Sequence, residues 1–573
     1  MLKDHPKGLF VAFFANMGER FSYYTMLAIF VLYLQARFGF SAGEAGDFYG
    51  GFLFGIYFLP ILGGIIADRW GYGRTITWGI LIAFLGKIIL TIPGYSQGFF
   101  SNQWELIIII ISLVVISLGT GLFKGNLQAL VGKLYDAPEF APKRDNAFNI
   151  FYMGINIGAF LAPYAATSAV KHVLGRDGFL YENSMPHLAN LQAQAHPFLD
   201  QMIGTVQNHF SGTVHYIDKI EAFKSQMAFS GSVSEFATTY TSSLSVGYST
   251  AFAIAAVAMV ISLLVFIGFK KYYKHADLTV RQAKEKAERE GTEDTTVTMS
   301  KAEEKKRMVA LGLVFITVAF FWMAFHQNGF TLTIFARDFT VSKVSSLSYL
   351  FFDLRTFIPI LAAIGGLIFM FRKSSPIKTK MISAGVFVAG TAIAYYFYSG
   401  FDKTMNIEPE IFQSFNPIFI VVLTPVIVGF FNWLRARGKE PSSPRKIGMG
   451  MFITSLGFVV MMFSAFHLQR VTGLSPNWLI STYFILTVAE LFLSPIGISF
   501  VAKVAPPRFS GVAQGGWLGA TAIGNLLAGM VGKLWDIVEL WQFFLLLVVL
   551  TLLSGVFIFS IIRILENATK SSE

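Results

Sequence analysis

Residues 16–24 read NMGERFSYY and place a carboxylate and a guanidinium, Glu19 and Arg20, side by side within residues 9–34, a stretch otherwise apolar enough to cross a bilayer. A charged side chain near the middle of a membrane costs about 2.5–3.5 kcal/mol on insertion scales, so such residues usually face a protein interior or a water-filled path. A structural ion pair between two helices is one interpretation. The two tyrosines that end the quoted stretch lie one turn further on the same side of the helix, and this clustering of polar groups favours a transport site.

The composition is that of a membrane protein. Of the 573 residues, 54% are hydrophobic and only 14% are charged, with a mean hydropathy of +0.57, whereas about a quarter of the residues of a soluble protein are charged. The net charge of +11 is not accompanied by a basic patch interleaved with aromatic residues, so we expect no nucleic-acid partner. The chain has no cysteine, which excludes disulfides and thiol chemistry, and we expect no metal or other cofactor.

Apolar runs of about 20 residues predict fourteen membrane-spanning helices. Lysine and arginine collect in alternate connections between these runs, and all such clusters fall on one side of the membrane if the N-terminus is cytoplasmic. We therefore expect a multi-pass protein with both termini in the cytoplasm. The N-terminal residues MLKDHPKGLF lack the features of a signal peptide, so we expect the first helix to be retained.

A weak internal repeat predicts two halves. Residues 13–30 and 320–335 share an aromatic start, a polar cluster at similar depth and an apolar finish. Lys124 in the fourth span has a counterpart in Glu490 of a later span, each a single charge in apolar surroundings. The core is then six helices plus six, with a site near the midplane between the halves, as in secondary transporters built from repeats.

The predicted organisation has five parts. Two segments differ from the apolar core: a polar stretch with helical spacing, expected to be an outward-facing insertion, and a charged linker between the halves. A further pair of apolar runs is expected to be an added hairpin that faces lipid. The parts are an N-terminal six-helix bundle (1–170 and 246–270), an extracytoplasmic insertion (171–245), a cytoplasmic linker (271–307), a C-terminal six-helix bundle (308–345 and 401–573) and the transmembrane hairpin (346–400).

Several motifs in the correct order resemble those of the proton-dependent oligopeptide transporters, the POT or PTR family of the major facilitator superfamily. They are GERFSYY, GGIIADRWGYGR, GLFKGN, FYMGINIGAFLAP, FNPIFIVVLTP and AELFLSP. The resemblance implies the major facilitator fold, twelve core transmembrane helices in two bundles plus the hairpin. It also implies symport of di- and tripeptides with protons by alternating access, in the bacterial inner (plasma) membrane, by a protein that contacts membrane lipids and is expected to be monomeric.

A zwitterionic peptide presents a carboxylate and an ammonium group at a nearly fixed separation, so its site needs a cationic and an anionic pole. Arg20 and Lys124 supply cations in the N-terminal half, and Glu490 supplies an acid in the C-terminal half. Hydroxyl, amide and aromatic groups that tolerate variable side chains are expected to line the space between them. The predicted lining residues are Tyr23, Tyr24, Tyr57, Asn156, Gln327, Asn416, Ser494 and Trp517.

Proton coupling requires a titratable group that competes with the substrate or with an ion pair, and Glu19, Glu490 and His326 are the candidates. Asn16 stands where the family pattern begins with glutamate, so one of the usual acids of this helix is absent, and we assign Asn16 a gating or structural role. His326 stands beside Gln327 where the family often has an acid. Its imidazole can replace the lost group, although a lone histidine in a helix is more often a packing residue.

Asp68, Arg69 and Arg74 are expected to form a cytoplasmic latch between helices, with plain positive-inside anchoring as the alternative. Two other functions remain open. One is transport of nitrate or of a small organic anion on the same fold, with altered proton coupling. The other is peptide sensing without transport. We do not expect an enzyme, because the sequence contains no HExxH helix.

Overall fold

The computed structural model describes residues 5–570 except 97–98, 138, 183–215, 278, 280–281, 283–298, 374 and 469–472. The described chain is almost entirely helical, and twelve of its helices are long and apolar enough to cross a membrane. Two further long helices, α1 and α19, are not among these twelve. The polar run at residues 16–24 lowers the hydropathy of α1, and α19 is rich in glycine. Together they make the fourteen long helices that the sequence predicts.

The first six long helices form the N-terminal bundle. Their ends follow local capping: α2 begins with a capping box between Ser41 and Glu44, and α1 ends at Gly39, whose φ of 68° suits glycine. The helices are α1 (Lys7–Phe38), α2 (Ala42–Trp70), α3 (Tyr72–Tyr95), α4 (Asn102–Lys133), α5 (Arg144–Arg176) and α9 (Val233–Gly268), with the short helices η1 (Ala141–Lys143), η2 (Lys270–Tyr272) and η3 (Lys274–Ala276) at the end that carries the N-terminus.

The second bundle begins with α11 (Lys301–Phe325), whose span is interrupted by the 3-10 turn η4 (His326–Gly329) and continues as α12 (Thr331–Phe339). The polar residues HQNG form this turn, so the interruption lies at a polar cluster of the sequence. The other elements are η5 (Pro409–Ser414), α16 (Phe415–Arg435), α17 (Ser443–Leu468), α18 (Asn477–Val504), η6 (Pro507–Phe509), α19 (Ser510–Gly532), η7 (Lys533–Asp536), α20 (Leu540–Ser560) and α21 (Ile562–Lys570).

The packing of the helices repeats between the two bundles. In the first, α3 packs along α4 and α9, and α1 packs along α9; in the second, the corresponding α17 packs along α18 and α20, and α11 packs along α20. The contacts between the bundles repeat as well, since α2 packs along α19 while α5 packs along α16. The internal repeat that the sequence suggested thus has a counterpart in the arrangement of the helices.

Three helices run further than the predicted part boundaries. Helix α5 extends to Arg176, α9 begins at Val233, and α11 begins at Lys301, so their polar ends lie in the ranges 171–245 and 271–307. Ser232 and Ser300 cap the extended N-termini of α9 and α11, which explains why helix continues beyond the apolar run. In the described part of the insertion, α8 (Tyr216–Gln226) packs beside α9.

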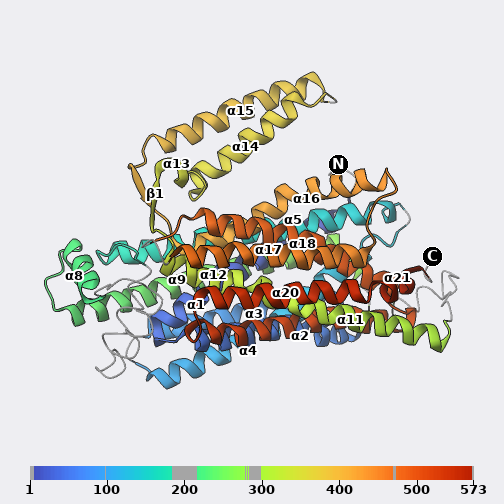
Figure 1. Cartoon of the computed structure of the whole chain (residues 1–573), viewed down its shortest axis with the longest axis horizontal. Helices are drawn as coiled ribbons and strands as arrows, with labels where there is room; N and C mark the ends of the chain where they lie inside the picture. Colours follow the sequence, from blue (N-terminus) through green and yellow to red (C-terminus); the bar gives the residue numbers. More distant parts are fainter. Residues whose placement is uncertain are drawn as a thin grey trace.

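The hairpin stands away from the two bundles, as Figure 1 shows. It consists of α13 (Ser346–Tyr349), α14 (Leu354–Phe371) and α15 (Ile377–Tyr398), and it is joined to the bundle by an antiparallel ribbon of β1 (Lys343–Ser345) and β2 (Thr404–Asn406). Helices α14 and α15 pack mainly on each other, closely enough that a Cβ at Gly390 would lie 2.6 Å from the Pro359 carbonyl oxygen. Most of their remaining surface is apolar and exposed, which agrees with a lipid-facing role.

Candidate functional site

Glu19 and Arg20 lie near the middle of α1 and form an ion pair with each other. Arg20 donates from Nε to Glu19 Oε2 at 2.5 Å and from Nη2 to Glu19 Oε1 at 2.7 Å, so both oxygens of the carboxylate are engaged. The Glu19 side chain is fully buried, and the guanidinium also lies 4.7 Å from the centroid of the Tyr23 ring. The guanidinium is therefore fixed by its own neighbour in this structure.

Lys124 approaches the same region from α4. Its Nζ lies 3.3 Å from the centroid of the Tyr57 ring and has no hydrogen-bond partner among the described residues. The ammonium position is buried and lies within electrostatic range of both Glu19 and Arg20. Three charged groups of the N-terminal bundle thus converge, as the sequence predicted, with Lys124 held by a cation–π contact rather than by an ion pair.

Glu490 lies on α18 and faces this cluster from the C-terminal bundle. Its Oε2 accepts a hydrogen bond of 3.0 Å from Asn416 Nδ2, and the same amide lies 3.0 Å from Thr487 Oγ1. Tyr24 interacts electrostatically with both Arg20 and Glu490, and Tyr57 does the same. The two tyrosines are therefore close enough to the Arg20 cation of one bundle and to the Glu490 acid of the other to be influenced by both.

The turn η4 contributes His326 and Gln327, which have different environments. The His326 ring lies 6.1 Å from the Tyr57 ring, and its Nδ1 lies 3.2 Å from the Trp322 carbonyl oxygen. Gln327 is fully buried and donates to the Met323 and Ala528 carbonyl oxygens, both at 3.2 Å, while its own oxygen accepts from Thr331. The bond to Ala528 ties η4 to α19, while the other two link it to the flanking α11 and α12, and the His326 ring is the member of the turn that lies near Tyr57.

The remaining predicted lining residues have mixed environments. Trp517 is buried against Gly497, where an added Cβ would lie 2.2 Å from the indole. Asn156 is half-buried and donates 3.2 Å to the Tyr152 carbonyl oxygen of its own helix. Ser494 is half-buried on α18, one turn beyond Glu490. Asn16 is buried, and its amide nitrogen has no hydrogen-bond partner among the described residues.

The predicted latch residues are exposed at the end of the bundle that carries the N-terminus. Asp68 accepts a hydrogen bond of 3.3 Å from the Tyr72 hydroxyl, while the structure gives Arg69 and Arg74 no ion pair among the described residues. A residue that the sequence analysis did not select, Asp277, accepts a 2.8 Å hydrogen bond from the Gly73 amide at the start of α3. Two carboxylates therefore lie at the turn between α2 and α3: Asp68 of α2, and Asp277 of the segment that follows α9.

The opposite end of the molecule holds the two bundles together. Arg337 of α12 donates 2.7 Å to Gln35 of α1, and Gln413 of η5 donates 3.2 Å to the Ala28 carbonyl oxygen. Glycines allow α2 and α19 to approach so closely that a Cβ at Gly529 would lie 2.2 Å from the Gly46 carbonyl oxygen. These contacts close the end that lies away from the N-terminus.

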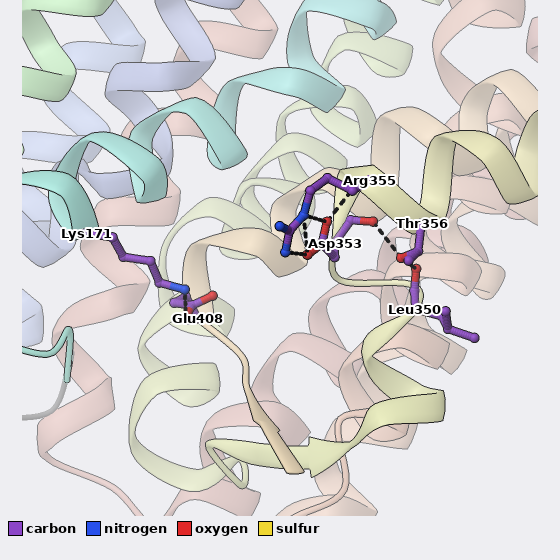
Figure 2. A network of polar contacts seen from close by, with 6 residues as sticks. All are labelled: Lys171, Leu350, Asp353, Arg355, Thr356 and Glu408. Carbon is purple, nitrogen blue, oxygen red and sulfur yellow. Dashed lines mark hydrogen bonds and ion pairs between the residues drawn. The ribbon is translucent and has the colours of Figure 1, made fainter. Parts of the chain in front are cut away.

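Two acids and a lysine add to this closed end and were missed by the sequence analysis. Figure 2 shows Lys171 of α5 paired with Glu408, which precedes η5, and Thr167 donates 2.7 Å to the buried Glu410. Burial raises the pKa of the Glu408 carboxyl, and Lys171 offsets only part of that shift. The signal was present in the sequence as EPE directly before an apolar run.

Figure 2 also shows Asp353 at the start of α14 bound to Arg355, with Nη2 and Oδ2 2.6 Å apart. Asp353 is buried and caps the helix through the Arg355 amide, whereas the Arg355 side chain is 60% exposed. The pair therefore fixes the base of the hairpin and does not extend to the central cluster.

Lys87 is the most informative residue that the sequence analysis missed. It lies in the middle of α3 in the run ILIAFLGKIIL, is 1% exposed, and its Nζ has no hydrogen-bond partner among the described residues. The same criterion that selected Lys124, a single charge in an apolar span, also applies to Lys87.

Comparisons with known proteins find similarity to transporters. A family model described as the POT family matches residues 73–181 and 381–540. The chain is 28% identical to the peptide transporter YePEPT of Yersinia enterocolitica, with 92% of this chain and 88% of the relative covered. It is 26% identical to the transporter YclF of Bacillus subtilis, covering 99% and 95%, and 26% identical to dipeptide and tripeptide permease B of Xenorhabdus bovienii, covering 93% and 88%.

Solved structures show the same fold. A peptide transporter POT in complex with sulfate superposes with a TM-score of 0.64 at 23% identity, covering 99% of this chain and 96% of the other. A POT family transporter in complex with 5-aminolevulinic acid gives a TM-score of 0.64 at 21% identity, with 98% and 97% covered. The predicted fold class, two six-helix transmembrane bundles of the major facilitator type, is confirmed.

Proposed function

We propose that the chain is a member of the POT family and a secondary active symporter that imports di- and tripeptides together with protons by alternating access. The observation that carries the proposal is the meeting of opposite charges from the two bundles. Lys124 of the N-terminal bundle lies against the Tyr57 ring, and Tyr24 and Tyr57 are each influenced electrostatically by Arg20 of that bundle and by Glu490 of the other. Relatives named as dipeptide and tripeptide permeases support short peptides as the substrate class.

In this proposal Arg20 and Lys124 bind the peptide carboxylate and Glu490 binds the amino group. Arg20 must exchange Glu19 for the substrate carboxylate, and Lys124 must leave the Tyr57 ring, so binding replaces contacts that already exist. Asn416 holds the Glu490 carboxylate in position. The remaining members of the proposed lining are Tyr23, Tyr24, Tyr57, Asn156, Gln327, Ser494 and Trp517.

The proposed coupling groups are Glu19, Glu490 and His326. Each lies in or beside the charge cluster, so a change of its charge alters the binding of a zwitterion. Asn16 cannot titrate, which leaves Glu19 as the acid of α1 within the membrane. The rocking of the two bundles about this cluster would expose it to each side in turn.

We also propose a bacterial plasma-membrane location, a monomeric state and cytoplasmic termini. The clustering of Lys and Arg at the end that carries the N-terminus supports this orientation. With the termini inside, the closed end that joins Arg337 to Gln35 and Lys171 to Glu408 is extracytoplasmic. We also propose that Asp68, Arg69 and Arg74 act as a cytoplasmic latch between helices.

Uptake of a labelled dipeptide into proteoliposomes tests the proposal. We expect accumulation that rises with an inward proton gradient, competition by unlabelled di- and tripeptides, and none by free amino acids. Nitrate or simple carboxylates that compete more strongly than peptides would identify an anion transporter instead. Binding of peptides without accumulation would identify a sensor.

A further inference from the structure

The charges inside the N-terminal bundle do not balance. Within the apolar parts of α1 to α5 and α9 the sequence contains one acid, Glu19, and three cations, Arg20, Lys87 and Lys124. The next acids along these helices lie at their ends, and Glu105 at the far end of α4 is already paired with Arg37. Glu19 is therefore the sole carboxylate that the helices of this bundle offer to the three cations within the membrane.

Lys87 lies at nearly the same depth as Glu19. Helices α1 and α3 begin at the same end of the bundle, where α4 ends, since Lys133 of α4 contacts the Tyr72 ring. At about 1.5 Å per residue, Glu19 lies about 18 Å and Lys87 about 22 Å from the first residues of their helices. The two depths differ by only about 4 Å, so Glu19 and Lys87 lie at a similar level of the bundle.

The neighbours of α3 give Lys87 no other partner. Helix α4 has no charged side chain between Glu105 and Lys124, α9 has none after Glu235, and α2 has none between Asp47 and Asp68. The charged groups whose electrostatic influence reaches Lys87 are then Glu19 and Arg20. Since a buried ammonium without hydrogen bonds is costly, the neutral amine is favoured while Glu19 is bound to Arg20.

We propose that Lys87 carries the coupling proton of the N-terminal bundle and serves as the alternative ion-pair partner of Glu19. This inference rests on the proposed function and adds Lys87 to its coupling groups. A substrate carboxylate takes Arg20, and the freed Glu19 carboxylate stays ionised by pairing with Lys87. The lone pair of Lys87 Nζ accepts a proton from the compartment to which the site is open, and the ammonium loses it when Arg20 returns to Glu19.

The exchange explains how a chain with Asn16 in place of an acid can remain coupled. A freed carboxylate in this apolar interior must either take a proton itself or find a cation. Lys124 is engaged by the substrate, which leaves Lys87. The charge of the cluster then changes by one unit for each substrate bound, without a second carboxylate on α1.

Two variants of Lys87 test the proposal in proteoliposomes, with Lys378→Met on the exposed face of α15 as the matched control. An inward gradient of one pH unit can raise the accumulation of peptide by up to about tenfold for each coupled proton. We expect this stimulation in the wild type and in Lys378→Met. Lys87→Met and Lys87→Arg should lose it, so that uptake with and without the gradient is equal, while exchange of labelled for unlabelled peptide at equal pH remains measurable.

Calorimetry of peptide binding in buffers of different ionisation enthalpy gives a second readout. The wild type should take up a proton with the peptide, and Lys87→Arg, whose charge is permanent, should not. Lys87→Arg also keeps a cation in the bundle, so it can still test whether Lys87 carries the coupling proton if Lys87→Met unfolds. Gradient stimulation or proton uptake retained by Lys87→Arg would overturn the role of Lys87 alone, whereas a wild type that accumulates no peptide would overturn the proposed function itself.

Discussion

The interiors of the two bundles differ in charge although their helices pack in the same pattern. The N-terminal bundle holds Arg20, Lys87 and Lys124 around a single acid, while the C-terminal bundle faces them with Glu490, which is held by the amide of Asn416. In the proposed function the two repeats divide the recognition of a zwitterion, with the anion-binding groups on one repeat and the cation-binding group on the other. The difference also suggests that charge exchange occurs mainly in the first bundle.

The largest effect is expected from removal of the guanidinium in the N-terminal bundle. Arg20→Ala leaves Glu19 buried without its bidentate partner, and breaking such a pair costs on the order of 3–5 kcal/mol. We expect uptake to fall by more than about 100-fold and the melting temperature to drop. Arg563→Ala, on exposed α21, is the control. Wild-type uptake by Arg20→Ala would contradict the assignment of the cationic pole.

Glu490→Gln tests the opposite pole in the C-terminal bundle. The variant keeps an oxygen that can accept from Asn416 but loses the negative charge, so recognition of the free amino group should weaken by about tenfold. Competition by Ala-Ala and by its N-acetylated form measures the change. The wild type should prefer the free amine, and Glu490→Gln should distinguish the two much less. Unchanged discrimination would remove Glu490 from the site.

A smaller effect is expected where the two bundles meet. Lys171→Met leaves the buried Glu408 without its cation and should open the end that lies away from the N-terminus, whereas Glu408→Gln should keep it closed. Burial raises the pKa of Glu408 in the closed state above its usual 4.5, so the closed state binds a proton more tightly than an open state in which Glu408 is hydrated. Lowering the pH from above the raised pKa of Glu408 towards 4.5 should therefore shift the population towards the state in which this end is closed.

The separation of the two bundles at this end can be measured as the distance between spin labels at Ser168→Cys on α5 and Lys403→Cys beside β2. The chain has no cysteine of its own, so only these two positions are labelled. The pH response should be present in the labelled parent and absent in Glu408→Gln. An identical response in both would show that Glu408 is not its source.

The smallest effect is expected outside both bundles. Arg355→Ala removes the exposed partner of Asp353 at the base of the hairpin, and exposed pairs contribute about 0–1 kcal/mol. Uptake should stay within about twofold of the wild type, with a small change in melting temperature. A loss as large as that of Arg20→Ala would show that the hairpin takes part in transport directly.

Much of the architecture could be predicted from the sequence because lipid penalises charge. The sequence predicts fourteen long helices in two bundles, and the structure contains them. Gln327 shows the limit of such reasoning: its motif predicts a lining role, and the sequence does not reveal the three hydrogen bonds that it makes, one of which reaches α19. Sequence spacing assigns a residue to a helix face and cannot tell whether neighbouring backbone already satisfies it.

The amino-acid sequence by itself determined that this is a two-bundle membrane protein with a few charges buried in apolar helices, because hydropathy and the cost of each charge can be evaluated residue by residue. The tertiary structure decided which partners those charges have. It joined Glu19 to Arg20, placed Lys124 on Tyr57, left Lys87 without a hydrogen bond among the described residues, and closed one end of the molecule. These outcomes depend on how helices distant in the chain are rotated and packed against one another, and local sequence does not specify that rotation.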